Sequence, residues 1–150
     1  MTIYIVDLEA VDTRYTKEWK THLPEQLKRH TNKEVVNISG GDTPQKTTPG
    51  AFLNFGGTNV YKSNQLAKIG EMFCEGKIKD GDYFLYTDAW NPTVIQLKYM
   101  AELLGVKIKI GGMWHAGSYD PADFLGRLIG KKPWVRLAEE SMYETFDHNF

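Results

Sequence analysis

Residues 83–110, YFLYTDAWNPTVIQLKYMAELLGVKIKI, decide the fold. The opening apolar run, YFLYT, is typical of a strand that is buried on both faces of a parallel sheet. Asn91-Pro92 starts a helix, because proline suits the first helical turn, and Gly105 ends it. The alternating VKIKI at 106–110 indicates a second strand near a sheet edge. We expect the helix to turn its large apolar residues inward: Ile95, Tyr99, Leu103 and Leu104.

The same alternation of strand and helix continues on both sides of this unit. Further strands are predicted at the short apolar runs 3–7, 34–39 and 134–137. A helix is predicted around Tyr15–Leu27, with a kink or a restart at Pro24. Further helices are predicted around Leu66–Phe73, with Thr58 or Ser63 as cap, at 121–128 and at 138–148. Residues 40–50 form a loop, and AFLNF (51–55) is either a short strand or an ordered loop. We therefore predict one three-layer, Rossmann-like α/β domain over residues 1–150, with a mostly parallel sheet.

Composition and charge narrow the class of protein. With 41% hydrophobic residues and a formal charge of −1, the domain is globular and its overall field does not attract nucleic acid. Two basic clusters are interpreted as solvated surface: Lys17, Lys20, Lys28, Arg29 and Lys33, and Arg127, Lys131, Lys132 and Arg136. The single cysteine, Cys74, excludes an intrachain disulfide and is expected to be buried and inert. No signal peptide or membrane span is recognisable, so we expect a cytoplasmic protein without a membrane partner.

Ligands of open α/β sheets bind beyond the carboxyl ends of the strands. Four segments follow predicted strands: DLEAVD (7–12), SGGDT (39–43), TDAWNP (87–92) and GGMWHAGSYD (111–120). The last one gathers glycines that let backbone approach a ligand, a tryptophan that can stack, and His115, which can exchange a proton near neutral pH. We expect the functional site there.

The other segments admit a plain structural interpretation as well. TDAWNP either forms a wall of the site or is only a capped turn that starts a helix. Asp7, Glu9 and Asp12 have oxygen ligands for a divalent metal, but their spacing matches no known ion site, and we predict no metal. The P-loop, the dinucleotide G-x-G-x-x-G, G-x-S-x-G and zinc-deaminase patterns are all absent.

Three stretches resemble a known family: RYTKEWKTHLPEQLKRH (14–30), GGMWHAGSYDPADF (111–124) and AEESMYETFDHNF (138–150). Together they resemble the N-terminal, acceptor-binding half of a GT-B-type glycosyltransferase, and among these the enzymes with which bacteriophages sugar-modify the bases of their DNA. In that family a second, C-terminal Rossmann-like domain binds most of the nucleotide-sugar. The resemblance covers the whole chain as topology, while its motifs are loose.

The resemblance implies roles for specific residues. His115 and Asp120 would be catalytic, orienting or deprotonating the acceptor hydroxyl. Substrate-binding residues would come from three loops: Asp12, Arg14 and Tyr15; Asp88, Trp90 and Asn91; and Trp114, Ser118 and Tyr119. The acceptor would be DNA or a small molecule. The donor half, with its acidic and phosphate-binding residues, is missing, so we expect a fragment of a longer enzyme that binds no cofactor alone and is inactive by itself.

Two other functions remain open. One is a standalone, flavodoxin-like domain that binds a nucleotide or another small ligand without catalysis. The other is a regulatory or protein-interaction domain in which Trp90, Trp114, Tyr119 and Trp134 form an exposed aromatic patch.

Overall fold

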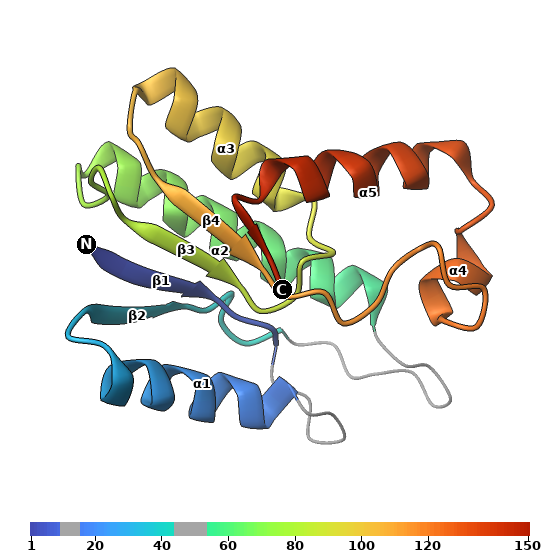
Figure 1. The fold of residues 1–150 in the computed structure, drawn as a ribbon, viewed down its shortest axis with the longest axis horizontal. Helices are drawn as coiled ribbons and strands as arrows, with labels where there is room; N and C mark the ends of the chain where they lie inside the picture. Colours follow the sequence, from blue (N-terminus) through green and yellow to red (C-terminus); the bar gives the residue numbers. More distant parts are fainter. Residues whose placement is uncertain (10–15, 44–53) are drawn as a thin grey trace.

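The computed structural model describes residues 1–9, 16–43 and 54–150. The described part contains five strands: β1 (Thr2–Val6), β2 (Glu34–Ile38), β3 (Tyr83–Tyr86), β4 (Lys109–Gly112) and β5 (His148–Asn149). Its helices are α1 (Thr16–His30), α2 (Phe55–Cys74), α3 (Thr93–Leu104), α4 (Phe124–Leu128) and α5 (Pro133–Thr145). The strands form one sheet in the order β2-β1-β3-β4-β5, and every neighbouring pair is parallel. The predicted three-layer, Rossmann-like α/β fold is confirmed (Figure 1).

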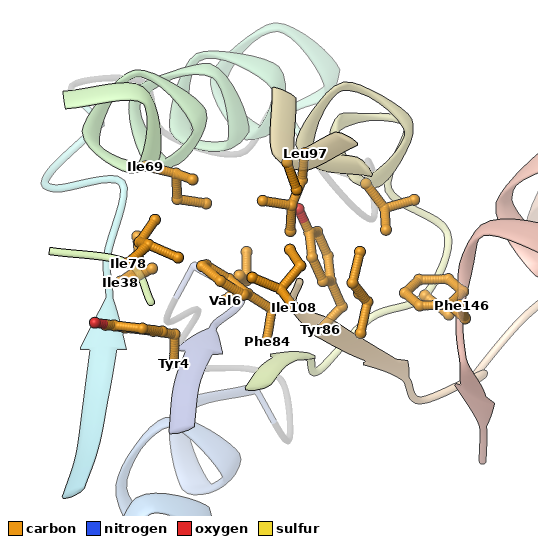
Figure 2. Packing of buried hydrophobic residues seen from close by; sticks show 14 of the residues in the cluster. Tyr4, Val6, Ile38, Ile69, Ile78, Phe84, Tyr86, Leu97, Ile108 and Phe146 are labelled. Atoms are coloured by element: carbon orange, nitrogen blue, oxygen red, sulfur yellow. The ribbon is translucent and has the colours of Figure 1, made fainter. Parts of the chain in front are cut away.

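Alternate residues of the strands point to opposite faces of the sheet. Tyr4, Val6 and Phe84 belong to the larger core, which α2, α3 and α5 cover (Figure 2). The neighbouring residues Ile3 and Ile5 belong to a smaller cluster on the other face, which α1 covers through Leu27. This division explains why the strands are nearly continuous apolar runs.

The strand order places a topological switch point in the middle of the sheet. The chain passes from β1 to β2 at one edge and then crosses to β3 on the other side of β1. Flavodoxin has the same order, and in such sheets the ligand crevice opens where the direction reverses, at the carboxyl ends of the strands. The segment carrying α4 lies beyond that edge, at the right of Figure 1.

The predicted inward face of α3 is wrong. Val94, Leu97 and Ala101 are buried, whereas the expected residues are exposed: Ile95, Tyr99, Leu103 and Leu104. The end of the helix is as predicted, because Gly105 adopts the left-handed conformation with φ 69°.

Other boundaries also differ from the sequence prediction. Residues 134–137 are not a strand but part of α5, which Pro133 opens, and the last strand is β5. Asn54 caps α2 through a hydrogen bond from the amide of Gly57 to its side chain (2.8 Å), so neither Thr58 nor Ser63 is the cap. Residues 51–53 of AFLNF lie outside the described residues.

Two further predictions concern single residues of helices. Cys74 is exposed at the end of α2 rather than buried. Pro24 is buried within α1, which runs from Thr16 to His30, so the helix does not restart at this proline. Among the helices described, none is both long and apolar enough to cross a membrane.

Candidate functional site

A cavity of about 580 Å³ lies at the carboxyl edge of the sheet. Four parts of the chain line it: the first turns of α2, the loop after β3, the segment after β4, and α4 with the start of α5. Its walls are mainly apolar: Phe55, Trp90, Pro92, Phe124, Leu125, Leu128, Ile129 and Trp134. The size and the apolar lining are typical of a site for a small organic ligand. We call this cavity the acceptor pocket, after the function proposed for it below.

His115 is the imidazole of the acceptor pocket. Its Nε2 lies 2.7 Å from the carbonyl oxygen of Thr87 at the end of β3. Because a carbonyl only accepts, Nε2 must carry the proton, and in the neutral ring the lone pair is on Nδ1. The ring of Trp19 in α1 packs edge-on against His115, with centroids 5.6 Å apart. The side chain thus has a fixed tautomer and a fixed orientation at the switch-point edge.

Three further ionisable side chains line the acceptor pocket: Lys62, Asp88 and Asp123. Asp88 accepts a hydrogen bond from the amide of Trp90 (3.1 Å), and Asp123 accepts from the amides of Gly117 (3.1 Å) and Phe124 (2.6 Å). Lys62 donates to the carbonyl of Trp90 at 3.4 Å. The two carboxylates give the pocket hydrogen-bond acceptors and a charge that disfavours an anion inside it.

Glu139 of α5 holds two walls of the site together. Its Oε2 accepts hydrogen bonds from the indole Nε1 of Trp90 (2.6 Å) and from the amide of Ser118 (2.6 Å). Glu139 is buried, so these bonds are shielded from water. The carboxylate therefore fixes the loop after β3 and the segment after β4 against each other.

Gly111 and Gly112 make room for aromatic side chains of the same domain rather than for a ligand. Both are buried in β4, and a Cβ at Gly112 would lie 2.6 Å from the ring of Phe146. At Gly111 the space is taken by Tyr83. The close approach that these glycines permit is thus between β4 and aromatic side chains of the same chain.

A buried polar cluster lies at the carboxyl end of β1. The carboxylate of Asp7 accepts hydrogen bonds from two buried side chains of α2, from Tyr61 and, at 3.1 Å, from Gln65. Its second oxygen lies 3.6 Å from Nζ of Lys20 in α1. Asp7 thereby ties helices from both faces of the sheet to the end of β1.

Burial raises the pKa of the Asp7 carboxyl, although Tyr61, Lys20 and Gln65 oppose the shift. An ion pair alone would lower it, but the side chain of Asp7 is 1% exposed against 29% for Lys20, so desolvation outweighs the pairing. A carboxyl whose pKa is higher in the folded than in the unfolded state stabilises the fold at acid pH. This contribution is lost as the pH rises through the folded-state pKa.

The variant Asp7→Asn is therefore expected to gain stability relative to the native chain as the pH rises toward neutrality. The measurement is urea unfolding of both proteins across the mildly acid to neutral range, with the exposed Asp42→Asn as control. A loss for Asp7→Asn that grows with pH would show instead that the ion pair with Lys20 stabilises the fold.

The structure distributes the residues predicted for the site over several places. His115, Asp88 and Trp90 come together in the acceptor pocket. Trp114 and Tyr119 line a separate cavity of about 410 Å³ with Tyr143. The predicted Asp12, Arg14 and Tyr15 lie outside the described residues.

The remaining predicted residues have structural partners. Asn91 is buried, and its Oδ1 accepts hydrogen bonds from the hydroxyl (2.8 Å) and the amide (3.2 Å) of Thr93. Ser118 is buried, and its amide donates a hydrogen bond to the carboxylate of Glu139 (2.6 Å). Asp120 is exposed, accepts from the amide of Ala122 (2.8 Å) and does not belong to the lining of the acceptor pocket.

Several lining residues were not predicted from the sequence, notably Lys62, Asp123 and Trp134. In the sequence, Lys62 follows two glycines in FGGTNVYKS (55–63), a weak signal because the glycine that directly precedes the lysine of a P-loop is absent. Asp123 and Trp134 reach the site because the chain after β4 folds back over it. As for the aromatic patch, Tyr119 and Trp134 are exposed, while Trp90 and Trp114 are half-buried.

Within residues 1–9, 16–43 and 54–150, no group of three or more histidine, cysteine, aspartate or glutamate side chains is placed to hold a metal ion. Asp7, one of the oxygen donors considered for a metal, is instead engaged by Tyr61, Gln65 and Lys20.

Comparisons of the chain with protein-family models, with curated proteins and with solved structures give no match.

Proposed function

We propose that this domain binds a neutral, hydroxyl-bearing acceptor in the acceptor pocket and acts as the acceptor half of a nucleotide-sugar-dependent glycosyltransferase. The observation that carries the proposal is the meeting of His115, Asp88 and Trp90 in one apolar cavity at the carboxyl edge of the sheet. Fold alone does not imply this function, so the chemistry of the pocket has to support it.

The polar groups of the pocket favour hydroxyl and amino groups over phosphate. Asp88 and Asp123 accept hydrogen bonds from such groups, and together they repel an anion more than Lys62 attracts it. The indole of Trp90 and the ring of Phe124 offer flat apolar surfaces to a planar ring or the apolar face of a sugar. A nucleoside with a primary hydroxyl, such as 5-hydroxymethyl-2′-deoxycytidine, combines these features.

His115 supplies the proton chemistry in this proposal. The imidazole of His115, which lines the pocket, takes the proton of the acceptor hydroxyl while the hydroxyl oxygen forms the bond to the sugar carbon. The bond between the sugar and its nucleotide breaks in the same transfer, and the leaving diphosphate needs stabilisation from a donor-binding domain. We therefore expect binding, but no turnover, by the 150 residues alone.

Calorimetric titration tests the proposal. We expect 5-hydroxymethyl-2′-deoxycytidine to bind more tightly than 2′-deoxycytidine and UDP-glucose not to bind. His115→Gln should weaken the first ligand about three- to tenfold, the equivalent of one hydrogen bond. The control is His30→Gln, an exposed histidine at the end of α1. Equal affinity for the two nucleosides, or tight binding of UDP-glucose, would contradict the assignment of this pocket to an acceptor.

A ligand-binding domain without catalysis is the second candidate, and the strand order that the sheet shares with flavodoxin favours it. This second function predicts that a nucleotide binds saturably in the crevice. It also predicts that 5-hydroxymethyl-2′-deoxycytidine and 2′-deoxycytidine bind with the same affinity. The titration with UDP-glucose thus separates the two functions.

A further inference from the structure

A second cavity, of about 410 Å³, is lined by α5 and by the segment after β4. Its lining consists only of aromatic and acidic side chains: Trp114, Tyr119, Glu139, Glu140, Tyr143 and Glu144. The volume falls within the roughly 300–1,000 Å³ that is usual for small-molecule sites. We call it the aromatic cavity.

The indole of Trp114 is a fixed wall of the aromatic cavity. Its Nε1 donates to Oδ1 of Asn149 in β5 at 2.8 Å, and its ring meets Phe146 edge-on, with centroids 6.1 Å apart. The ring of Tyr143 lies beside it, with centroids 6.3 Å apart and the planes inclined by 37°. Because the face of an aromatic ring carries negative electrostatic potential, such walls attract a cation.

The carboxylates of α5 add negative charge to the same cavity. Glu140 and Glu144 lie one helical turn apart and are both exposed, a spacing at which like charges destabilise a helix. Within the described part of the chain, neither of them has an ion pair, and Glu139 has none either. Asp147 and Glu102 differ, because each of them faces a lysine. The cavity therefore carries charge that no neighbouring lysine or arginine neutralises by contact.

Glu139 is the most informative of these carboxylates because it is only 8% exposed. Its Oε2 accepts from Trp90 and Ser118, whereas Oε1 accepts no hydrogen bond from the described residues. The residue beside Oε1 is Gly117, where a Cβ would lie 3.3 Å from this oxygen. Buried charges in proteins are ordinarily paired, so the free oxygen of Glu139 points to a positive partner from outside the domain.

Tyr119 already binds one cation of its own chain. The guanidinium of Arg136 lies 3.8 Å from the centre of the Tyr119 ring and donates to the carbonyl of Gly130 at 3.1 Å. The hydroxyl of Tyr119 donates to Glu140 at 3.1 Å. Arg136 does not line the aromatic cavity, and its single charge is smaller than that of the three carboxylates that do. The contact shows that a ring of this cavity accepts a cation on its face.

We propose that the aromatic cavity binds a methylated ammonium group, such as that of choline or of a trimethylated lysine side chain. The positive charge of this group is attracted by the ring faces and the carboxylates, and its methyl groups contact the apolar walls. An unmethylated lysine fits less well, because its ammonium is strongly hydrated and has three N–H donors that the rings leave unpaired. The proposal is independent of the acceptor function, since the two cavities share no lining residue.

Fluorine NMR of the protein labelled with 5-fluorotryptophan tests the proposal with choline as the probe. We expect choline to shift the signal of Trp114 saturably and to leave those of Trp90 and Trp134, in the acceptor pocket, in place. The uncharged analogue 3,3-dimethylbutan-1-ol has the same shape and should bind at least about tenfold more weakly. Equal affinity for the two compounds, or no saturable shift of Trp114, would overturn the proposal.

The ring of Tyr143 can be removed without disturbing the core, because this side chain is 54% exposed. Tyr143→Ala should weaken choline about three- to tenfold, as expected for one cation–π contact. The matched control is Tyr99→Ala on α3, where the tyrosine is 61% exposed and lines neither cavity, and it should keep the affinity within about twofold. Equal losses in the two variants would contradict a contact with Tyr143.

The charges are tested by Glu140→Gln/Glu144→Gln. This variant should bind choline about three- to tenfold more weakly at about 20 mM salt and lose less at about 200 mM, because salt screens exposed charges. The control Glu25→Gln/Glu71→Gln removes two exposed carboxylates of α1 and α2 and should have little effect. The same loss in both double variants would show a general charge effect and overturn the proposal.

A comparison of ligands identifies the source of the methylated ammonium. Tighter binding of Nα-acetyl-Nε-trimethyllysine than of choline would assign the cavity to a modified side chain of a partner protein. Tighter binding of choline would assign it to a small molecule or a headgroup. Both results support the proposal, whereas equal affinity for Nα-acetyl-lysine and its trimethylated form would overturn it.

Discussion

Glu139→Ala is expected to destabilise the domain by about 3–5 kcal/mol. The substitution leaves the indole N–H of the half-buried Trp90 and the buried amide of Ser118 without their acceptor, and hydrogen bonds to a charged group contribute about 1.5–3 kcal/mol each. Because these donors belong to two different segments, the contact between the loop after β3 and the segment after β4 should also weaken, although the amide of Ala89 still donates to the carbonyl of Met113 at 2.9 Å. We expect the nucleoside affinity of the acceptor pocket to fall together with stability.

Urea unfolding followed by tryptophan fluorescence measures this effect. Glu139→Gln is the conservative variant, since its amide oxygen can accept from both donors, and it should retain most of the stability. Glu140→Ala is the control, because Glu140 is exposed on α5 and, among the described residues, accepts a hydrogen bond only from the hydroxyl of Tyr119 (3.1 Å). If Glu139→Ala lowered the free energy of unfolding no more than Glu140→Ala does, the two hydrogen bonds of Glu139 would not stabilise the domain.

Leu97→Ala and Leu103→Ala should differ by about 3 kcal/mol although they lie on the same helix. Leu97 is 0% exposed in the main core, whereas Leu103 is 70% exposed. Truncating a buried leucine costs about 2–5 kcal/mol because apolar contacts are lost and a cavity remains. Truncating the exposed one should change the free energy of unfolding by less than about 0.5 kcal/mol.

The comparison of their urea midpoints decides which face of α3 packs on the sheet. A larger loss for Leu103→Ala would mean that the helix is rotated and that the face inferred from the largest apolar residues is the buried one. Both variants replace leucine by alanine in the same helix, so the change in helix propensity is the same and the difference between them reports on burial.

The fold was predictable because its strands and helix ends carry strong local signals. YFLYT, Asn91-Pro92 and Gly105 each indicate one structure, and together they define a strand–helix–strand unit. The face of α3 was not predictable in this way. Val94, Leu97 and Ala101 form one stripe at helical spacing, and Ile95, Tyr99 and Leu103 form another. Periodicity alone cannot choose between two apolar stripes, and here the smaller residues pack on the sheet.

The start of α5 shows a second limit. Residues 134–137, WVRL, are three apolar residues interrupted by Arg136, and four positions are too few to distinguish a strand from one helical turn. Pro133 at the first helical position and the later buried residues Val135, Glu139 and Met142 show the helical period over a longer range.

The position of the candidate site followed from the order of the strands, but the residues that line it did not. His115, Asp88 and Trp90 follow predicted strands and meet at the predicted edge. Lys62 comes from α2 and Trp134 from α5, and long-range packing alone brings them to the pocket. Trp114 shows the opposite case, because its indole turns to Asn149 of β5 at 2.8 Å and leaves the acceptor pocket.

Fluorine NMR of the protein labelled with 5-fluorotryptophan tests the central claim most directly. The four tryptophans report on three cavities: Trp90 and Trp134 on the acceptor pocket, Trp114 on the cavity beside Tyr143, and Trp19 on a shallow site on α1. Titration with 5-hydroxymethyl-2′-deoxycytidine should shift the signals of Trp90 and Trp134 most and leave that of Trp114 in place. A shift confined to Trp114, or no shift at saturating nucleoside, would contradict an acceptor site in this pocket.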